Sequence, residues 1–215
     1  MLMLEKGKMG IRKINAIETK TKIFETAKSL FRKHGFENVS VDAIVGAAGV
    51  AKGSFYVHYA SKDAIVAAYI SDYVNKVDTD YKAYIDSIDT QLAASDIFLS
   101  LLEKIADILI HEIGYDQIKT LYRVQITKSV NVDSVMSYQR DIYKMFHDIL
   151  SRGMQQGEFR TDISLDVLTK HFMMAIRGIT YEWCIRYPEF DLTEEVLQHF
   201  QILLAGIKYH PGSAF

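Results

Sequence analysis

The stretch SVDAIVGAAGVAKGSFYVHYASK, residues 40–62, decides the fold, because it predicts two short helices joined by a tight turn. Ser40 is placed to cap the first helix with its hydroxyl, and Asp42 lies in the first turn, where negative charge suits the helix dipole. Gly49 ends that helix, because glycine accepts the left-handed backbone that a sharp turn needs. The second helix covers residues 52–59 and carries Phe55 and Tyr59 four positions apart, on one side.

The other sides of this second helix carry a set of side chains that is rich in hydrogen-bond donors and contains no acid. The set comprises Lys52, Ser54, Tyr56 and His58. A short helix with a cation at its start, hydroxyl groups and an aromatic ring suits insertion into the major groove of DNA. On spacing alone, an ordinary corner between two packed helices remains the alternative.

The segment GVAKGSFYVHYASKDAIV, residues 49–66, resembles the signature of TetR-type transcriptional repressors over most of its positions. The resemblance implies a helix-turn-helix that binds DNA. It also implies that several residues lie at or near DNA, namely Ser40, Lys52, Gly53, Ser54, Tyr56, His58, Tyr59 and Lys62. In this interpretation Gly53 lets the backbone approach the groove, Lys52 and Ser54 lie near base edges, and Tyr56 and Lys62 contact phosphates.

Two positions depart from the family pattern. Ala51 stands where the family often has a capping Ser or Thr, so the second helix begins less firmly, by about 0.5–2 kcal/mol. Ala60 stands where a lysine is frequent, which removes one phosphate contact. Both departures concern the tightness of binding and leave the binding mode unchanged.

Composition and charge narrow the class of protein. With 215 residues, 49% of them hydrophobic, and two prolines, the chain predicts an all-α fold with a sizeable core. The single cysteine, Cys184, excludes an internal disulfide and fits a cytoplasmic protein. Neither a secretory signal nor a membrane-spanning run is predicted.

The charge is distributed unevenly along the chain. The first 60 residues carry ten Lys or Arg against five acidic residues, a net charge of +5. Because the whole chain has a net charge of −2, the remainder sums to −7. A basic head on an acidic body indicates that the head alone meets a polyanion such as DNA.

Helical periodicity extends over the rest of the chain and predicts about nine helices in all. We expect a flexible basic arm over residues 1–15, a three-helix DNA-binding head over 16–75, and a larger helical domain for ligand binding and dimerisation over 76–215. The first helix is predicted from Ala16 to His34, and Thr19 near its start is placed to contact a phosphate. A single helix is expected from Asn131 to Met154.

The last two predicted helices lie within residues 164–208 and carry more apolar residues than one buried side each can use. In the TetR family the equivalent pair packs against its copy in a second subunit. A helix-turn-helix protein that binds palindromic DNA also needs two copies, spaced about one helical turn apart. Both arguments predict a homodimer through these helices.

Catalytic and metal-binding motifs are absent from the sequence, which carries no nucleotide-binding glycine loop, zinc-protease motif or nucleophile elbow. We therefore predict neither an enzyme nor a cofactor. Four scattered histidines, each on a different predicted helix, make a metal site an unfavoured alternative: His111, His147, His171 and His199.

The family resemblance implies a small-molecule site in the helical body, between helices. The predicted lining is Asp107, Tyr122, Gln125, Tyr143, Phe146, His147, Phe172, Met173 and Trp183. Aromatic and methionine side chains beside a carboxylate suit an apolar or cationic effector. The alternative for each of these residues is ordinary core packing.

The predicted function is a sequence-specific repressor that binds a palindromic operator as a dimer and is released by a ligand. One alternative is a transcriptional activator of the same fold. Another is a helical dimer without a ligand, which either binds DNA regardless of sequence or has a purely structural role.

Overall fold

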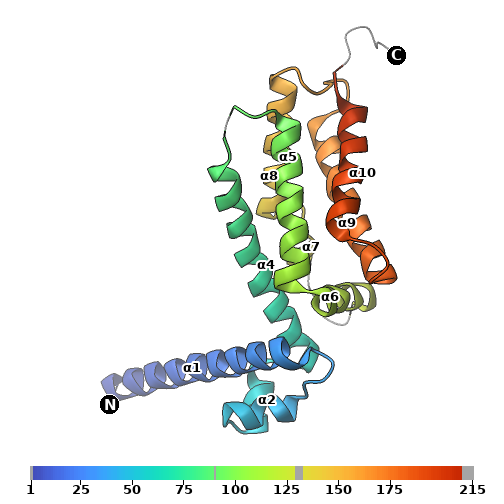
Figure 1. Ribbon diagram of the computed structural model, residues 1–215. Helices are drawn as coiled ribbons and strands as arrows, with labels where there is room; N and C mark the ends of the chain where they lie inside the picture. Colours follow the sequence, from blue (N-terminus) through green and yellow to red (C-terminus); the bar gives the residue numbers. More distant parts are fainter. Residues whose placement is uncertain (1, 90, 129–132, 210–215) are drawn as a thin grey trace. The chain divides into compact units, whose positions relative to one another are not determined.

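The fold is known from a computed structural model that describes residues 2–89, 91–128 and 133–209, apart from the side chains of residues 2–12, 134 and 136. The elements are α1 (Leu2–His34), α2 (Val41–Ala48), α3 (Lys52–His58), α4 (Lys62–Ser87), α5 (Ala94–Asp107), the π-helical η1 (Ile108–Ile113), α6 (Tyr115–Thr127), α7 (Asp133–Met136), α8 (Asp141–Gln155), α9 (Leu165–Arg186) and α10 (Leu192–Ile207). Helices account for all named elements of the described residues (Figure 1), which confirms the predicted all-α class.

Contacts divide the chain into two compact units. The first unit comprises Met1–Asp72 with Arg123–Val132, and the second comprises Tyr73–Tyr122 with Asp133–Phe215. The division therefore falls within α4 and again within α6, whereas the sequence placed one boundary after Asn75. No local pattern marks the second crossing, because both parts of α6 belong to one uninterrupted helix.

Helices α1, α2 and α3 pack against one another in the first unit. Ile23, Ala27 and Phe31 recur every four residues on α1, and all three are buried. Phe31 packs against the ring of Phe36, with centroids 4.8 Å apart, and Phe55 of α3 is fully buried. This core fixes α3 by one side and leaves its other side available.

Helix α1 is longer than the sequence predicted. It begins at Leu2 rather than near Ala16, so residues 2–15, which were expected to form a flexible arm, continue the helix. Residues 2–15 include Gly7 and Gly10 but no proline, and most of the other residues are good helix formers such as Leu, Met, Glu and Lys. The end of α1 agrees with the prediction, since Gly35 follows His34 with φ +75°.

The second unit contains a ring of four helices (Figure 1). Helix α5 packs against α10 and α8, while α9 packs against α8 and α10. Phe98 of α5 lies at the centre of this ring, with its centroid 4.7 Å from that of Phe146 and 5.2 Å from that of Phe172. All three rings are buried, so they hold the bundle together through burial of aromatic surface.

The predicted helix over residues 131–154 is interrupted. Helix α7 ends at Met136 and α8 begins at Asp141, while Asn131, the expected cap, lies outside the described residues. The Ser137 hydroxyl accepts a hydrogen bond from the backbone N–H of Gln139, which offers the chain a turn in place of a helix. Arg140 then donates to Asp78 of α4 and to the carbonyl of Val135, which holds the turn in place.

Candidate nucleic-acid interface

The turn between α2 and α3 has the predicted local geometry. Ser40 Oγ accepts a hydrogen bond from the backbone N–H of Ala43 at 3.1 Å and so caps α2. Gly49 adopts the left-handed conformation, with φ +61° and ψ +41°, and its N–H donates to the Gly46 carbonyl. These two contacts define where α2 begins and ends, and they set the direction in which α3 leaves the turn.

Helix α3 is anchored by Phe55 and Tyr59. The Phe55 ring is fully buried, and its centroid lies 5.7 Å from that of Tyr59, which is itself 7% exposed. Burial raises the pKa of the Tyr59 hydroxyl, because the ionised form is poorly solvated there. Tyr59 was predicted among the DNA contacts, but its burial assigns it to the support of α3 instead.

The opposite surface of α3 is open to solvent. Lys52, Gly53 and Tyr56 are exposed, and the Tyr56 ring keeps one edge against Phe55 at a centroid distance of 5.4 Å. A Cβ added at Gly53 would meet no atom within 4 Å. Nothing within the described chain therefore requires a glycine at this position, and a close approach by an external molecule would explain it.

Lys52 is held by an ion pair with Asp42 that sequence reasoning did not foresee. The Lys52 Nζ lies 2.7 Å from Asp42 Oδ1 and donates to Oδ2 at 3.0 Å. The hydrogen bond to Asp42, and then its charge, raise the pKa of Lys52. The pair joins the first turn of α2 to the first residue of α3. Asp42 had been assigned only a helix-dipole role.

The other predicted contacts surround α3 but are partly engaged within the chain. Ser54 and His58 are half-buried on α3. Lys62 is half-buried, and its Nζ donates to the carbonyl of Glu37 at 3.2 Å. Thr19 Oγ1 donates to the carbonyl of Asn15 at 2.8 Å. Lys62 and Thr19 must therefore exchange or share a present partner to contact DNA.

Val57 is a surface residue of α3 that the sequence analysis left unassigned. Its side chain is 78% exposed, although valine is apolar. Val57 was not predicted as a DNA contact, because only the hydrogen-bond donors of α3 were assigned to DNA. The signal was present in the pattern, since Val57 lies two residues from both Phe55 and Tyr59 and therefore points away from the buried side.

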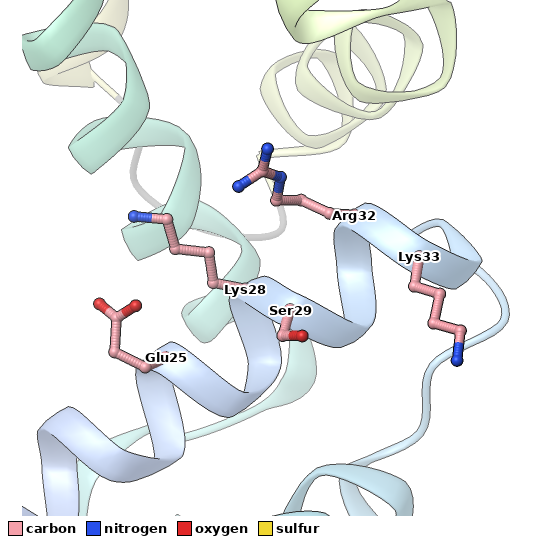
Figure 2. A pocket seen from close by; sticks show the side chains of 5 residues that line it. All are labelled: Glu25, Lys28, Ser29, Arg32 and Lys33. Carbon is pink, nitrogen blue, oxygen red and sulfur yellow. The ribbon is translucent and has the colours of Figure 1, made fainter.

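A further cationic surface lies on α1. Lys28, Arg32 and Lys33 line a shallow hollow of about 350 Å³ together with Glu25 and Ser29, as Figure 2 shows. The Lys28 Nζ lies 3.4 Å from Asp72 Oδ2 in the same unit. These side chains contribute to the positive charge of the first unit.

The residues that were predicted to line a ligand site lie in several different environments. Phe146, Phe172 and Met173 are buried in the packed bundle. Trp183 packs edge-on against the stacked rings of Tyr115 and Tyr187, with centroids at 5.9 and 5.5 Å. For these four residues the geometry supports core packing, which was the alternative weighed for each of them.

The polar members of that set are dispersed as well. Tyr122 donates its hydroxyl to the Arg177 carbonyl at 2.9 Å, and burial raises the pKa of Tyr122. Tyr143 is half-buried, and His147 Nδ1 lies 3.3 Å from Asp148 Oδ1.

Asp107 is exposed and lines a surface hollow of about 310 Å³, together with Tyr84, Glu103, Lys104 and Thr193. Gln125 differs, because its Nε2 is buried without a hydrogen-bond partner among the described residues. A buried amide donor of this kind marks a place where a ligand or water would be stabilised.

Metal binding and membrane insertion are the other functions to consider for the described residues. Within them, no group of three or more His, Cys, Asp or Glu side chains could hold a metal ion. In the same part of the chain, no helix combines the length and apolarity needed to cross a membrane.

The helix-turn-helix segment matches the sequence model described as "Bacterial regulatory proteins, tetR family" over residues 23–69. Over this segment the chain is similar to the TetR family. It is 24% identical to the transcriptional repressor KstR2 of Mycolicibacterium smegmatis, over 88% of this chain and 91% of that protein. It is 26% identical to KstR2 of Mycobacterium tuberculosis, over 86% of this chain and 90% of the relative.

Among solved structures, the fold is shared with Thermus thermophilus FadR, a TetR-family repressor in complex with lauroyl-CoA. The TM-score is 0.67 at 21% identity, over 91% of this chain and all of the FadR chain. These TetR-family relatives are transcriptional regulators, which confirms the prediction of a DNA-binding regulator and not an enzyme.

Proposed function

We propose that this TetR-family regulator represses transcription by binding a roughly palindromic operator as a dimer, and that a small effector releases it. The observation that carries the proposal is the open surface of α3, where Lys52, Gly53 and Tyr56 project from the basic first unit. The KstR2 relatives are named repressors, which favours repression over activation by the same fold.

The contacts divide by chemistry. Tyr56 and Lys62 supply a hydroxyl and an ammonium group to phosphates, which position the protein without selecting a sequence. Lys52 and Ser54, one turn nearer the start of α3, face base edges in the major groove. At the edges of the interface, the hydroxyl groups of Ser40 and Thr19 contact the DNA backbone. The imidazole of His58 adds one further contact to the DNA.

A dimer face within residues 164–208 is supported by exposed apolar side chains on α9. Val167, Met174 and Tyr181 recur seven residues apart, and Ile185 follows one turn later; their exposed fractions lie between 41% and 60%. Gly178 lies within the same row, and a Cβ added there would meet no atom within 4 Å. A second copy of α9 can therefore approach this face closely and bury the row.

The effector is better described as apolar than as cationic. Asp78 is the one fully buried acidic residue in the described part of the chain, and it is already paired with Arg140. Asp107, the carboxylate expected to attract a cation, is exposed and lies 3.5 Å from Lys104. The FadR structure contains lauroyl-CoA, a ligand with a long apolar chain, which supports an apolar ligand for the shared fold.

Release follows from linkage between the two binding events. An effector weakens operator binding only to the extent that it prefers the conformation in which the paired α3 helices no longer fit successive grooves. A coupling of about 1–3 kcal/mol corresponds to a change in operator affinity of about 5- to 150-fold.

Fluorescence anisotropy with the operator and with a random duplex, across a range of salt concentrations, tests this function. Specific binding whose affinity falls with salt is expected. Equal affinity for both duplexes would establish the sequence-indifferent alternative, and binding that ignores salt would overturn the electrostatic interface.

Tyr56→Ala provides the matched variant. It should weaken operator binding while sedimentation shows an intact dimer, because the Tyr56 ring is 51% exposed. Tyr209→Ala, which removes a similarly exposed ring (57%) from the second unit, should leave operator binding unchanged. Loss of both dimer and DNA binding in Tyr56→Ala would show that Tyr56 is a structural residue.

A further inference from the structure

The most exposed large hydrophobic side chain in the described part of the chain lies on the helix that is proposed to enter DNA. Val57 is 78% exposed, against 68% for Ile202 and 66% for Ile126. Exposure of an apolar valine side chain to water is unfavourable. Helix α3 has only seven residues with which to meet a partner, and Val57 is one of them. An apolar group on the outermost surface of α3 therefore calls for an apolar partner in the groove.

The position of Val57 on α3 is well defined. Each residue advances an α-helix by about 100°, so Val57 lies roughly 200° from the buried Phe55 and points away from the core. Gly53 is one turn earlier on the same face, and Ser54 lies beside it. Because Gly53 is open to solvent and has no side chain, nothing protrudes from the helix surface next to Val57. A DNA base can therefore approach Val57 closely.

The major groove offers one apolar group among the four base-pair edges, the C5-methyl of thymine. Valine carries two methyl groups on a short, stiff side chain, so it can cover a thymine methyl without bridging to phosphates. A hydrogen-bonding residue at this position would select other base edges. The apolar side chain of Val57 can pack against a thymine methyl, and the absence of a side chain at Gly53 leaves room for it.

We propose that Val57 is a specificity-determining residue that contacts the C5-methyl of one thymine in each operator half-site. The inference rests on the proposed function, because it requires α3 to enter the major groove. The same surface would accept 5-methylcytosine, which presents the same methyl group in the groove.

The test begins with operator sequences that the purified protein selects from a random duplex pool. Each thymine of the selected operator is then replaced by deoxyuridine, which removes the methyl and leaves the base-pairing edge unchanged. For the wild-type dimer, one thymine position in the half-site should be sensitive, and its substitution in a single half-site should lower affinity by about fourfold, the worth of one buried methyl group. The other thymines should respond by less than twofold.

Val57→Ala should bind the unsubstituted operator more weakly and should lose its response at that one thymine. Thermal unfolding should be unchanged, because the side chain makes little contact with the fold at 78% exposure. Val57→Thr, which keeps the shape and replaces one methyl by a hydroxyl, should show an intermediate response.

Equal responses of wild type and Val57→Ala at every thymine would overturn the inference. So would a wild-type operator with no methyl-sensitive thymine in the half-site. Failure of the proposed function has a separate signature, since then the pool would yield no enriched sequence and the protein would show no salt-dependent preference for one.

Discussion

Replacement of Asp42 by Asn should strengthen DNA binding and make it more dependent on salt. In the free protein, Asp42 holds Lys52 Nζ at 2.7 Å, so one cation of α3 is neutralised before DNA arrives. Asp42→Asn keeps the size of the side chain and its place in the first turn of α2, but it releases that cation. It also removes a negative charge from the surface that faces phosphates.

The magnitude follows from counterion release. Each phosphate neutralised by a cation makes the slope of log K against log salt more negative by about 0.9 on duplex DNA. On a random duplex, which offers Lys52 no matched base edge, the released ammonium group can reach one additional phosphate per protomer, so the slope for a dimer should steepen by roughly 1.8. The gain in affinity should be greater for a random duplex than for the operator. The ratio of operator affinity to random-duplex affinity should therefore fall.

The assay is anisotropy titration of a random duplex and the operator with wild type and Asp42→Asn at several salt concentrations. Asp86→Asn is the matched control, because it changes the net charge by the same amount. It breaks a comparably exposed pair in the second unit, where Lys82 Nζ lies 3.0 Å from Asp86 Oδ2. The double variant Asp42→Asn/Lys52→Met should return the slope to the wild-type value.

An equal change in Asp42→Asn and Asp86→Asn would refute the reasoning, since net charge alone would then explain the effect. Weaker operator binding by Asp42→Asn would refute it in a different way. That result would show that Asp42 itself contacts a base, or that its pairing with Lys52 places the ammonium group where DNA needs it.

Three further predictions concern the second unit. Gly153→Ala should lower the free energy of unfolding by about 1–3 kcal/mol in urea denaturation, because the new Cβ would overlap the buried ring of Phe159; an unchanged midpoint would show that the ring can move aside. Glu158→Gln should lower the free energy of unfolding by about 0.5–2 kcal/mol, because the carboxylate accepts the N–H groups of Ala94 and Ser95 at the start of α5, at 2.7 and 3.1 Å; a loss no larger than that of Glu189→Gln, an exposed control, would contradict this. Burial raises the pKa of the Cys184 thiol to about 11. Iodoacetamide should therefore alkylate native protein slowly at pH 8, faster as the pH approaches 11, and at the rate of a free thiol after denaturation; equal rates before and after denaturation at pH 8 would refute the shift.

Several features of this protein could be predicted from the sequence because they depend on contacts within a few residues. The Ser40 cap reaches only Ala43, and the left-handed turn at Gly49 depends on the residue type itself. The Ser61 hydroxyl likewise accepts a hydrogen bond from the N–H of Ala64 at 3.1 Å and caps the start of α4. Helical periodicity was sufficient for the all-α class, because burial on one side of a helix repeats with a local period.

The candidate site was predicted less completely. The positions on α3 followed from the motif, but two of its features depend on neighbours that the motif does not specify. In the sequence, the hydroxyl of Tyr59 makes it a candidate DNA contact. In the fold its ring is buried, because α3 packs against α1 and α2. The place of Asp42 in the first turn of α2 could be predicted, because acidic residues are favoured there. Its ion pair with Lys52 could not, because it forms only when the turn brings the two helices together.

Tertiary structure alone decided the contacts between distant parts of the chain. Glu158 lies 64 residues after Ala94, yet it supplies the hydrogen bonds that the start of α5 lacks from its own cap residue. Arg140 pairs with Asp78 across 62 residues. The expected effector residues were likewise separated by packing, because similar aromatic side chains serve equally well in a core or in a pocket until the helices are in place. Sequence by itself determined the all-α class, the cap and the turn that bound α2, and the motif proposed to meet DNA, since these depend on backbone geometry over one or two turns. The structure decided which of those side chains remain exposed to meet a partner, because exposure depends on everything that packs around them.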